Sequence, residues 1–508
     1  MAQPRPKTGA RLLLAAAVTL SLSGCFAAAA PAPAADAGTR IRVAMLQPPR
    51  SGLTPLSDDA FKLSRWKTAE TLVILDELGD AQPSLATAWE QLDGRTWRFE
   101  VRQGVTFHDG TPLTADQVAA SLTAAAHASP KPRILDGVQL SARTDGGNAV
   151  VVTTQTDDPL VPQRLSSPQL AILAASAYQP GGVVSPLNAG TGPYVLDAVD
   201  GTTSATLNRF ERYWGEKAAA AGVDVQFVPD GTARAAALRT GTADIVEAIP
   251  VGQAARIDPA LVHEVPMPRT NTLYLNTASG PFADPAVRAA AREATNRAAI
   301  VEGVYEGRAD RAEGLLGPAL PWVAKEREAP SYAKVLGERP AAAPVNGVRI
   351  KLGTFTDRAE LPEVAVQLEQ QLEAAGFTVE QDVREYQHIE ADALDGQFDA
   401  FILSRATVLD SGDPVAYLYS DFSCAGSFNI SQFCDPAVDA ALVNAAAIPA
   451  GPERREAIAA AEALILARDA AVPLLHERVI QGESATIGNV VRDPRERALV
   501  TSKTGFAG

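Results

Sequence analysis

Hydrophobic and polar residues alternate one by one in several short segments of this chain. A period of two is typical of β-strands, because successive side chains point to opposite faces of a sheet. The strands predicted in this way cover residues 40–45, 96–101, 224–228, 349–355, 378–380 and 398–403. Strands are therefore expected along most of the chain from residue 40 onward.

Between these segments, apolar residues recur every three or four positions, as they do on the buried face of a helix. Thr114 and Gln117 form a capping box, and Asp284 precedes a proline suited to the first helical position. The predicted helices follow Thr114, cover 232–240, run from Pro285 to about Val304, and span Val364 to Leu372. Strands that alternate with helices predict an α/β fold with open mixed or parallel sheets. Such sheets bind ligands beside strand ends or in clefts between domains.

The first residues have the pattern of an export signal. Arg5, Lys7 and Arg11 precede an apolar run, Leu12 to Leu22, that is too short to span a bilayer. The run ends in Leu22-Ser23-Gly24-Cys25, which resembles the bacterial lipobox. We therefore expect 1–24 to be a signal peptide and Cys25 to be lipidated. Residues 25–38, rich in Ala and Pro, would be a tether. The alternative is an ordinary secretory signal with an incidental cysteine.

Composition narrows the class of protein further. The chain has 508 residues and a formal net charge of −15, which argues against binding nucleic acid. Two cysteines besides Cys25 are present, Cys424 and Cys434, ten positions apart. In an exported protein such a pair predicts a disulfide. A metal site at these cysteines is the weaker alternative, because no histidine or third cysteine lies nearby.

Several sequence blocks occur in a fixed order along the chain. They are Gln82 to Glu90, Trp97 to Val118 with Phe107-His108-Asp109-Gly110 inside it, Gly190-Thr191-Gly192-Pro193-Tyr194, Tyr213-Trp214-Gly215, Ala237-Leu238-Arg239-Thr240-Gly241 with Asp244, Leu275-Asn276-Thr277, and Asn296-Arg297 with Ile300. This series resembles the signature of the family 5 bacterial solute-binding proteins, and the resemblance covers roughly residues 40 to 480.

The resemblance implies a periplasmic-binding-protein-like fold in which two lobes close on a ligand about a hinge. It predicts a first lobe built from 38–70, 184–272 and 478–508, an inserted subdomain at 71–183, and a second lobe at 273–477. It also implies the binding subunit of an ATP-driven (ABC) importer: a monomer without cofactor, outside the cytoplasmic membrane, that works with permease and ATPase subunits. The lipid anchor would be its contact with the membrane.

Three residues are the candidate ligand-binding groups. Asp410 occupies the place at which peptide-binding members of the family bind a peptide's α-ammonium group, although Thr407 replaces the family's tryptophan nearby. Arg405 comes at the end of a predicted strand and is either a ligand contact or part of a salt bridge. Arg133 lies near the position where nickel-complex binders hold a carboxylate. Two arginines in one cleft would suit a ligand with several carboxylates, since guanidinium and carboxylate pair through two hydrogen bonds.

Three functions are compared on this basis. Binding of di- or oligopeptides comes first, because Asp410 and the cysteine pair fit it. Binding of nickel or another metal in a histidine- or opine-type chelate comes second. A secreted hydrolase comes last, because the chain has neither a Gly-x-Ser-x-Gly nor a His-Glu-x-x-His motif and only five histidines. His108, Trp89, Trp97 and Trp214 are expected to be structural.

The lipobox generates the first testable prediction. Cys25→Ala removes the thiol to which lipid would be attached, so the exported protein should leave the membrane fraction and appear in the soluble extract. Fractionation of cells that express both forms measures this. Unchanged membrane retention of the Cys25→Ala protein would reject the lipobox.

Overall fold

The computed structural model describes residues 40–408 and 411–506. The expected signal peptide, Cys25, the tether and Asp410 lie outside the described residues. None of the helices within the described ranges is long and apolar enough to cross a membrane.

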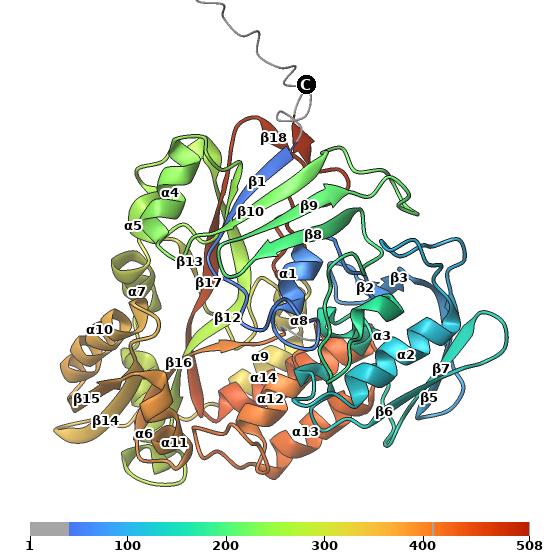
Figure 1. Ribbon diagram of the computed structural model, residues 1–508. Helices are drawn as coiled ribbons and strands as arrows, with labels where there is room; N and C mark the ends of the chain where they lie inside the picture. The colour runs from blue at the N-terminus through green and yellow to red at the C-terminus, as the bar shows by residue number, and fades with distance from the viewer. Residues whose placement is uncertain (1–39, 409–410, 507–508) are drawn as a thin grey trace, which may run out of the picture. The chain divides into compact units, whose positions relative to one another are not determined.

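The main structure is one mixed sheet in which the strands follow the order β15-β14-β16-β12-β17-β11-β1-β10-β9-β8, with β13 added on β17 (Figure 1). β1 is parallel to β10 and β11, β14 is parallel to β15 and β16, and the remaining pairs are antiparallel. The strands are β1 Arg40–Met45, β8 Tyr194–Asp200, β9 Ser204–Arg209, β10 Gly222–Phe227, β11 Ile245–Val246, β12 Val262–Leu275, β13 Ala309–Arg311, β14 Val348–Phe355, β15 Phe377–Arg384, β16 Ala400–Ala406 and β17 Ala471–Glu483. The predicted α/β fold with mixed sheets is confirmed.

Two long strands, β12 and β17, join the two halves of this sheet. They pair antiparallel from Val262 opposite Gly482 to Tyr274 opposite Ala471. The register shifts between Pro266 and Thr270, which is a β-bulge. A bulge leaves residues of one strand without a partner and changes the direction of their side chains. This bulge contains Arg269.

A four-stranded antiparallel sheet lies within residues 71–183. Its order is β4-β5-β7-β6, and helix α2 packs against β6 and β7. Thr114 caps α2 by accepting a hydrogen bond from the Gln117 amide, as predicted, but within the described chain the Gln117 side-chain oxygen has no hydrogen-bond partner, so the second bond of a capping box is not formed. The elements are β2 Val73–Leu75, β3 Ala81–Pro83, β4 Ala86–Gln91, β5 Thr96–Val101, α2 Ala115–Ala126, η2 Arg133–Leu135, β6 Leu140–Thr144, β7 Ala149–Thr154 and α3 Val161–Arg164.

The remaining helices are α1 Ala60–Arg65, α4 Gly231–Arg239, α5 Val251–Ala254, α6 Pro285–Ala294, α7 Arg297–Val304, α8 Val323–Arg327, α9 Pro330–Leu336, α10 Glu360–Ala374, α11 Tyr386–Leu394, α12 Val415–Phe422, α13 Pro436–Ala447 and α14 Pro452–Ala467. Of these helices, α4, α7, α10, α11 and α14 pack against strands of the large sheet, and α8, α9, α12 and α13 pack on α14. The two short strands β18 Ile487–Gly488 and β19 Gly505–Phe506 pair near the end of the chain.

Buried apolar side chains form two large clusters and a smaller one. The first large cluster contains only residues between Leu273 and Leu475. The second contains residues between Ile41 and Ile245 together with Ile487, Leu499 and Val500. The C-terminal segment thus returns to the cluster in which the described chain begins.

One predicted helix is wrong in its extent. The pattern predicted a single helix from Pro285 to about Val304, but the structure has two, with a break at Thr295 and Asn296. The Asn296 side chain accepts a hydrogen bond from the Ala299 amide (3.1 Å) and so caps a new helix. Asparagine favours such local hydrogen bonds over the interior of a helix, which explains the break.

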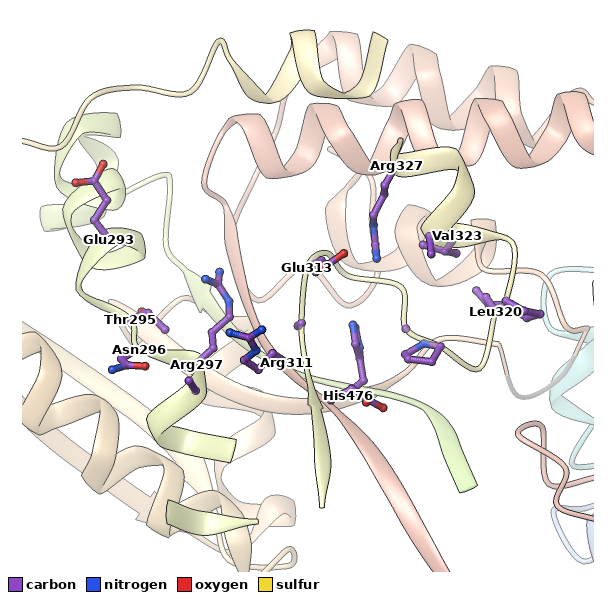
Figure 2. A pocket seen from close by; sticks show the side chains of 17 residues that line it. Glu293, Thr295, Asn296, Arg297, Arg311, Glu313, Leu320, Val323, Arg327 and His476 are labelled. Carbon is purple, nitrogen blue, oxygen red and sulfur yellow. The ribbon is translucent and has the colours of Figure 1, made fainter. Parts of the chain in front are cut away.

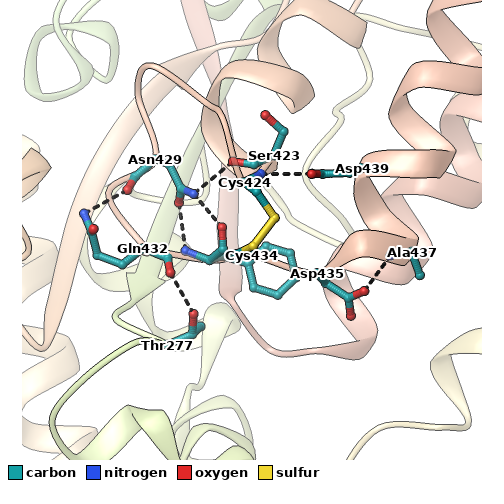
Figure 3. Close-up of a disulfide and its surroundings, with 10 residues drawn as sticks. Thr277, Ser423, Cys424, Asn429, Gln432, Cys434, Asp435, Ala437 and Asp439 are labelled. Carbon is teal, nitrogen blue, oxygen red and sulfur yellow. Dashed lines mark hydrogen bonds between the residues drawn. A yellow bond between two sulfur atoms is a disulfide. The ribbon is translucent and has the colours of Figure 1, made fainter.

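The loop between Cys424 and Cys434 is closed by a disulfide and filled by one side chain (Figure 3). The Asn429 amide donates to the carbonyls of Ser423 (3.1 Å) and Phe433 (2.6 Å), and its oxygen accepts from the Phe433 amide (3.0 Å). These bonds fix the loop from inside, so the two cysteines are held next to each other.

The disulfide should contribute to stability through the unfolded chain. Closing a loop of this length removes conformational entropy from the unfolded state, worth about 3 kcal/mol in the chain-entropy model. Mass measurement after alkylation without reductant should show no free thiol at Cys424 or Cys434. The Cys424→Ser and Cys434→Ser double variant should lose about that free energy of unfolding in a denaturant titration. Alkylation of both thiols in the native protein would contradict this.

Candidate ligand-binding site

A cavity of about 570 Å³ lies beside β12 and β17, and residues of both strands line it. Its walls include Met45 and Tyr305, one from each large cluster, and Arg133 from the segment between α2 and β6, so it joins parts of the chain that are far apart in sequence. Its charged lining consists of Asp58, Lys62, Arg65, Arg133, Arg234, Glu247, Arg269, Arg358, Glu360, Glu477, Arg478 and Glu496.

Most of the cations in this lining already have partners. Arg358 pairs with Glu477 (2.9 Å), Arg65 pairs with Glu247, and Arg478 bonds to Glu264 (2.8 Å) and Asp310. Arg234 donates instead to four backbone carbonyls, of Val228, Pro229, Glu247 and Ala248. These contacts fix the walls of the cavity and leave little charge for a ligand.

Arg269 differs from the other cations of the cavity. Its Nε is buried without a hydrogen-bond partner, and within the described ranges its guanidinium has neither a hydrogen bond nor an ion pair. Burial lowers the pKa of Arg269, as do the charges of Arg358 and Arg133, while Glu477 and Glu496 oppose the shift. A buried guanidinium without a counter-ion is costly, and a ligand carboxylate would compensate it with two charge-assisted hydrogen bonds.

The structure brings one of the predicted ligand residues to this cavity. Arg133, in η2, lines it and lies 3.4 Å from Asp58. Arg405 does not belong to its lining. Asp410 falls in the gap of the described chain, so its predicted role stays a prediction.

Arg405 is bound within the protein. It pairs with the fully buried Asp421 (2.8 Å), donates to Ser420 (3.1 Å) and stacks on the ring of Phe428 at 4.2 Å. Burial disfavours the charge of Arg405, but the Asp421 carboxylate outweighs this effect and raises the pKa of Arg405. This is the salt bridge at a strand end that the sequence offered as the second interpretation of Arg405.

Sequence reasoning missed Arg269, Arg358 and Glu496. A signal for Arg269 was available, because Pro266 and Pro268 stand close together directly before it. Proline cannot donate to a strand ladder and is confined to edges and bulges, so the pair indicates an irregularity at this point. Nothing in the local sequence indicates that the bulge would face Arg358 or Glu496.

A second cavity, of about 1010 Å³, lies beside α7, α8 and β13 (Figure 2). Its lining includes Arg297, Arg311 and Arg327 together with Glu293, Asp310 and Glu313, so opposite charges are equal in number. Its His476 is buried next to Thr270 (2.9 Å), and burial lowers the pKa of this imidazole to about 3, which leaves it neutral. The cavity therefore lacks an excess of charge that would favour an ionic ligand.

His108 and the tryptophans serve the fold, as expected. His108 bonds to the Gly192 carbonyl (2.9 Å) and packs edge-on against Phe210, and burial lowers its pKa to about 4. The indole of Trp97 donates to the Asp158 carbonyl, and that of Trp214 donates to Glu70. Neither these residues nor Trp89 line the two cavities.

The fold is thus a large mixed sheet whose two halves are joined by β12 and β17, with a cavity lined from several parts of the chain. The model of the bacterial extracellular solute-binding proteins, family 5, matches residues 80–429. The chain belongs to this family. Its members bind solutes for ABC importers outside the cytoplasm and are not enzymes, so the predicted class is confirmed and the hydrolase is excluded.

Individual relatives are distant. The nickel-binding periplasmic protein of Escherichia coli is 28% identical over 398 residues, which cover 69% of this chain and 72% of that protein. A probable di/tripeptide-binding protein of Pseudomonas aeruginosa is 27% identical over 435 residues, which cover 78% and 82%. A nickel ABC transporter structure from Bacillus halodurans superposes with a TM-score of 0.78 at 24% identity, over 92% of this chain and 100% of the other. This last likeness establishes the fold.

The Arg405–Asp421 pair generates a prediction that separates stability from binding. Arg405→Gln leaves a fully buried carboxylate without its cation, and breaking a buried pair in this way costs about 3 kcal/mol. A urea titration should show this loss, whereas Arg349→Gln, at an exposed arginine, should leave stability unchanged. If Arg405→Gln instead kept full stability and lost solute binding, Arg405 would be a ligand contact after all.

Proposed function

We propose that this protein captures a small solute through a carboxylate group and delivers it to the permease of an ABC importer. The observation that supports the proposal is the half-buried Arg269, which lines the cavity with a buried Nε and without a hydrogen bond or ion pair among the described residues. A ligand carboxylate would supply the missing counter-ion. Such contacts are stronger than those between neutral groups.

A di- or oligopeptide is the first candidate solute. A peptide carries a carboxylate for Arg269 and an ammonium group, and acidic side chains also line the cavity. A volume of about 570 Å³ is within the range of small-molecule sites. The relative from Pseudomonas aeruginosa is described as a probable di/tripeptide-binding protein, which is consistent with this candidate. Asp410 remains the residue that the sequence assigns to the ammonium group.

A metal chelate with several carboxylates is the second candidate. Arg133 and Arg358 line the same cavity as Arg269, and both lie close enough to lower its pKa. A second carboxylate of the chelate would then compete for Arg133 or Arg358 with their partners Asp58 and Glu477. Among residues 40–408 and 411–506, no group of three His, Cys, Asp or Glu side chains is placed to hold a metal ion. In this candidate the chelator therefore supplies the metal ligands and the protein binds its carboxylates.

The two large clusters support a mechanism in which lobes close on the solute. We propose a first lobe of 38–70, 184–272 and 478–508 with its subdomain 71–183, and a second lobe of 273–477. β12 and β17 connect the two clusters and would act as the hinge. Asp58 and Arg133, which belong to the proposed first lobe with its subdomain, and Arg358, which belongs to the proposed second lobe, all line the cavity. A solute that contacts both sides favours the closed form, because only differential binding shifts such an equilibrium.

The proposed protein is monomeric and is held at the outer face of the cell membrane by lipid on Cys25. A single acyl chain anchors weakly, at about 0.8 kcal/mol per buried methylene, so several chains are expected on this cysteine. The tether at 25–38 would let the binding unit reach the permease and its ATPase subunits.

Thermal-shift screening with dipeptides, oligopeptides and nickel with histidine or opine-type chelators tests the proposal. A solute at a hundredfold excess over its dissociation constant should add about 2.7 kcal/mol of stability, which is a clear shift of the melting temperature. Arg269→Gln should abolish the shift, because truncating one partner of a buried charge pair costs about 2 to 5 kcal/mol of binding.

Arg349→Gln is the matched control, since it removes an exposed arginine from β14 and should keep the shift. The class of compound that gives the shift decides between the two candidates. A solute that stabilises the wild type and Arg269→Gln equally would contradict the assigned role of Arg269.

A further inference from the structure

Glu496 is a second cavity residue with an unpaired charge. Its side chain lines the solute cavity and a small adjoining space next to Arg65 and Glu247. Within residues 40–408 and 411–506, its carboxylate takes part in no hydrogen bond and no ion pair, whereas Glu247 is engaged by Arg65, and Glu477 by Arg358. Glu360 of the lining is also unpaired among the described residues, but only Glu477 and Glu496 of these carboxylates act on the charge of Arg269. Glu496 is therefore the unpaired carboxylate that acts on the unpaired guanidinium of the cavity, that of Arg269.

The backbone around Glu496 is held in a conformation that glutamate rarely adopts. Its φ is +57°, in the left-handed region that disfavours side chains with a Cβ. The Asp493 side chain maintains this loop by accepting hydrogen bonds from the amides of Arg495 (2.9 Å), Arg497 (2.9 Å) and Ala498 (3.0 Å). Residues kept in such conformations against their own preference occur at functional sites, because the surrounding structure has to compensate for them.

Charges on several elements act on Glu496. Burial raises the pKa of its carboxyl group, the guanidinium groups of Arg65 and Arg269 lower it, and Glu247 and Asp493 raise it. Arg65 is already paired with Glu247, which leaves Arg269 as the unpaired charge of opposite sign. When a ligand carboxylate occupies Arg269, Glu496 loses that compensation and repels the same carboxylate.

We propose that Glu496 selects solutes that carry a protonated amine together with the carboxylate. This rests on the proposed function, in which Arg269 binds the carboxylate. An ammonium group would give Glu496 a charge-assisted hydrogen bond, whereas a purely anionic solute would face its repulsion. Specificity of this kind combines an attractive contact with the wanted ligand and a penalty on its competitor.

A pair of ligand libraries tests the selection. Wild-type protein is mixed with a dipeptide library and, separately, with the same library after N-acetylation, and the bound species are measured by native mass spectrometry. The wild type should bind free-amine dipeptides at least tenfold more tightly. Glu496→Gln should reduce this preference to less than threefold, mainly by weakening the free-amine dipeptides. Glu216→Gln, at an exposed glutamate remote from the cavity, should keep the full preference.

The outcomes separate this inference from the proposed function. A full preference in Glu496→Gln, with its loss in Asp410→Ala, would assign the amine to Asp410 and overturn the role of Glu496. No preference for the free amine in the wild type would also overturn it. If Arg269→Gln bound each library as tightly as the wild type does, the proposed function itself would be contradicted. Binding of neither library by the wild type would contradict the inference and the peptide candidate together.

A glycine variant checks the role of the backbone. Glycine adopts a φ of +57° without the cost of a Cβ, so Glu496→Gly should raise the melting temperature of the solute-free protein while it removes the amine preference. Glu496→Gln keeps the Cβ and should not raise the melting temperature. A Glu496→Gly protein that melts at a lower temperature than the wild type would show that Glu496 is needed for folding, which contradicts a role in selection.

Discussion

The antiparallel pairing of β12 with β17 is the interaction on which the rest of the described structure depends. These strands lie inside the large sheet. The first large apolar cluster includes Tyr274 and Ala471, which pair at one end of the ladder. The second includes Ile245 and Ile487, which flank in sequence the other end, where Val262 pairs with Gly482. A regular ladder would give every residue of β12 a neighbour in β17. The shift between Pro266 and Thr270 interrupts this regularity and places Arg269 at the cavity. The connection between the two halves and the proposed ligand contact thus come from the same pair of strands.

Charge pairing separates the structural residues of the cavity from those proposed for binding. A buried ion pair fixes geometry because removing either partner leaves an uncompensated charge. Arg65 with Glu247 and Arg358 with Glu477 are of this kind, as is Arg405 with Asp421 outside the cavity. Arg269 and Glu496 have no such partners among the described residues. A solute that pairs with both would remove a cost that the solute-free protein carries, which is why its binding would also stabilise the fold.

Much of the fold could be predicted from the sequence, because local patterns determine it. The strand at 40–45, the N-cap at Thr114 and the helix predicted from Val364 to Leu372 all depend on residues close together in the chain. The break at Asn296 was missed because one side chain competes with the continuous helical pattern around it. The cavity could not be predicted in the same way. Arg133, Arg269 and Glu496 meet only through strand pairing between distant segments, and a short-range pattern carries no information on that pairing.

The most direct test of the account is to identify what the protein retains when it is purified. Wild-type protein and Arg269→Gln, expressed in the same exporting host on rich medium, are purified without denaturation and then unfolded. The released small molecules are identified by mass spectrometry. The account predicts a carboxylate-bearing solute, close to one equivalent in the wild type and absent from Arg269→Gln. A neutral solute, or the same solute in equal amounts from both proteins, would contradict it.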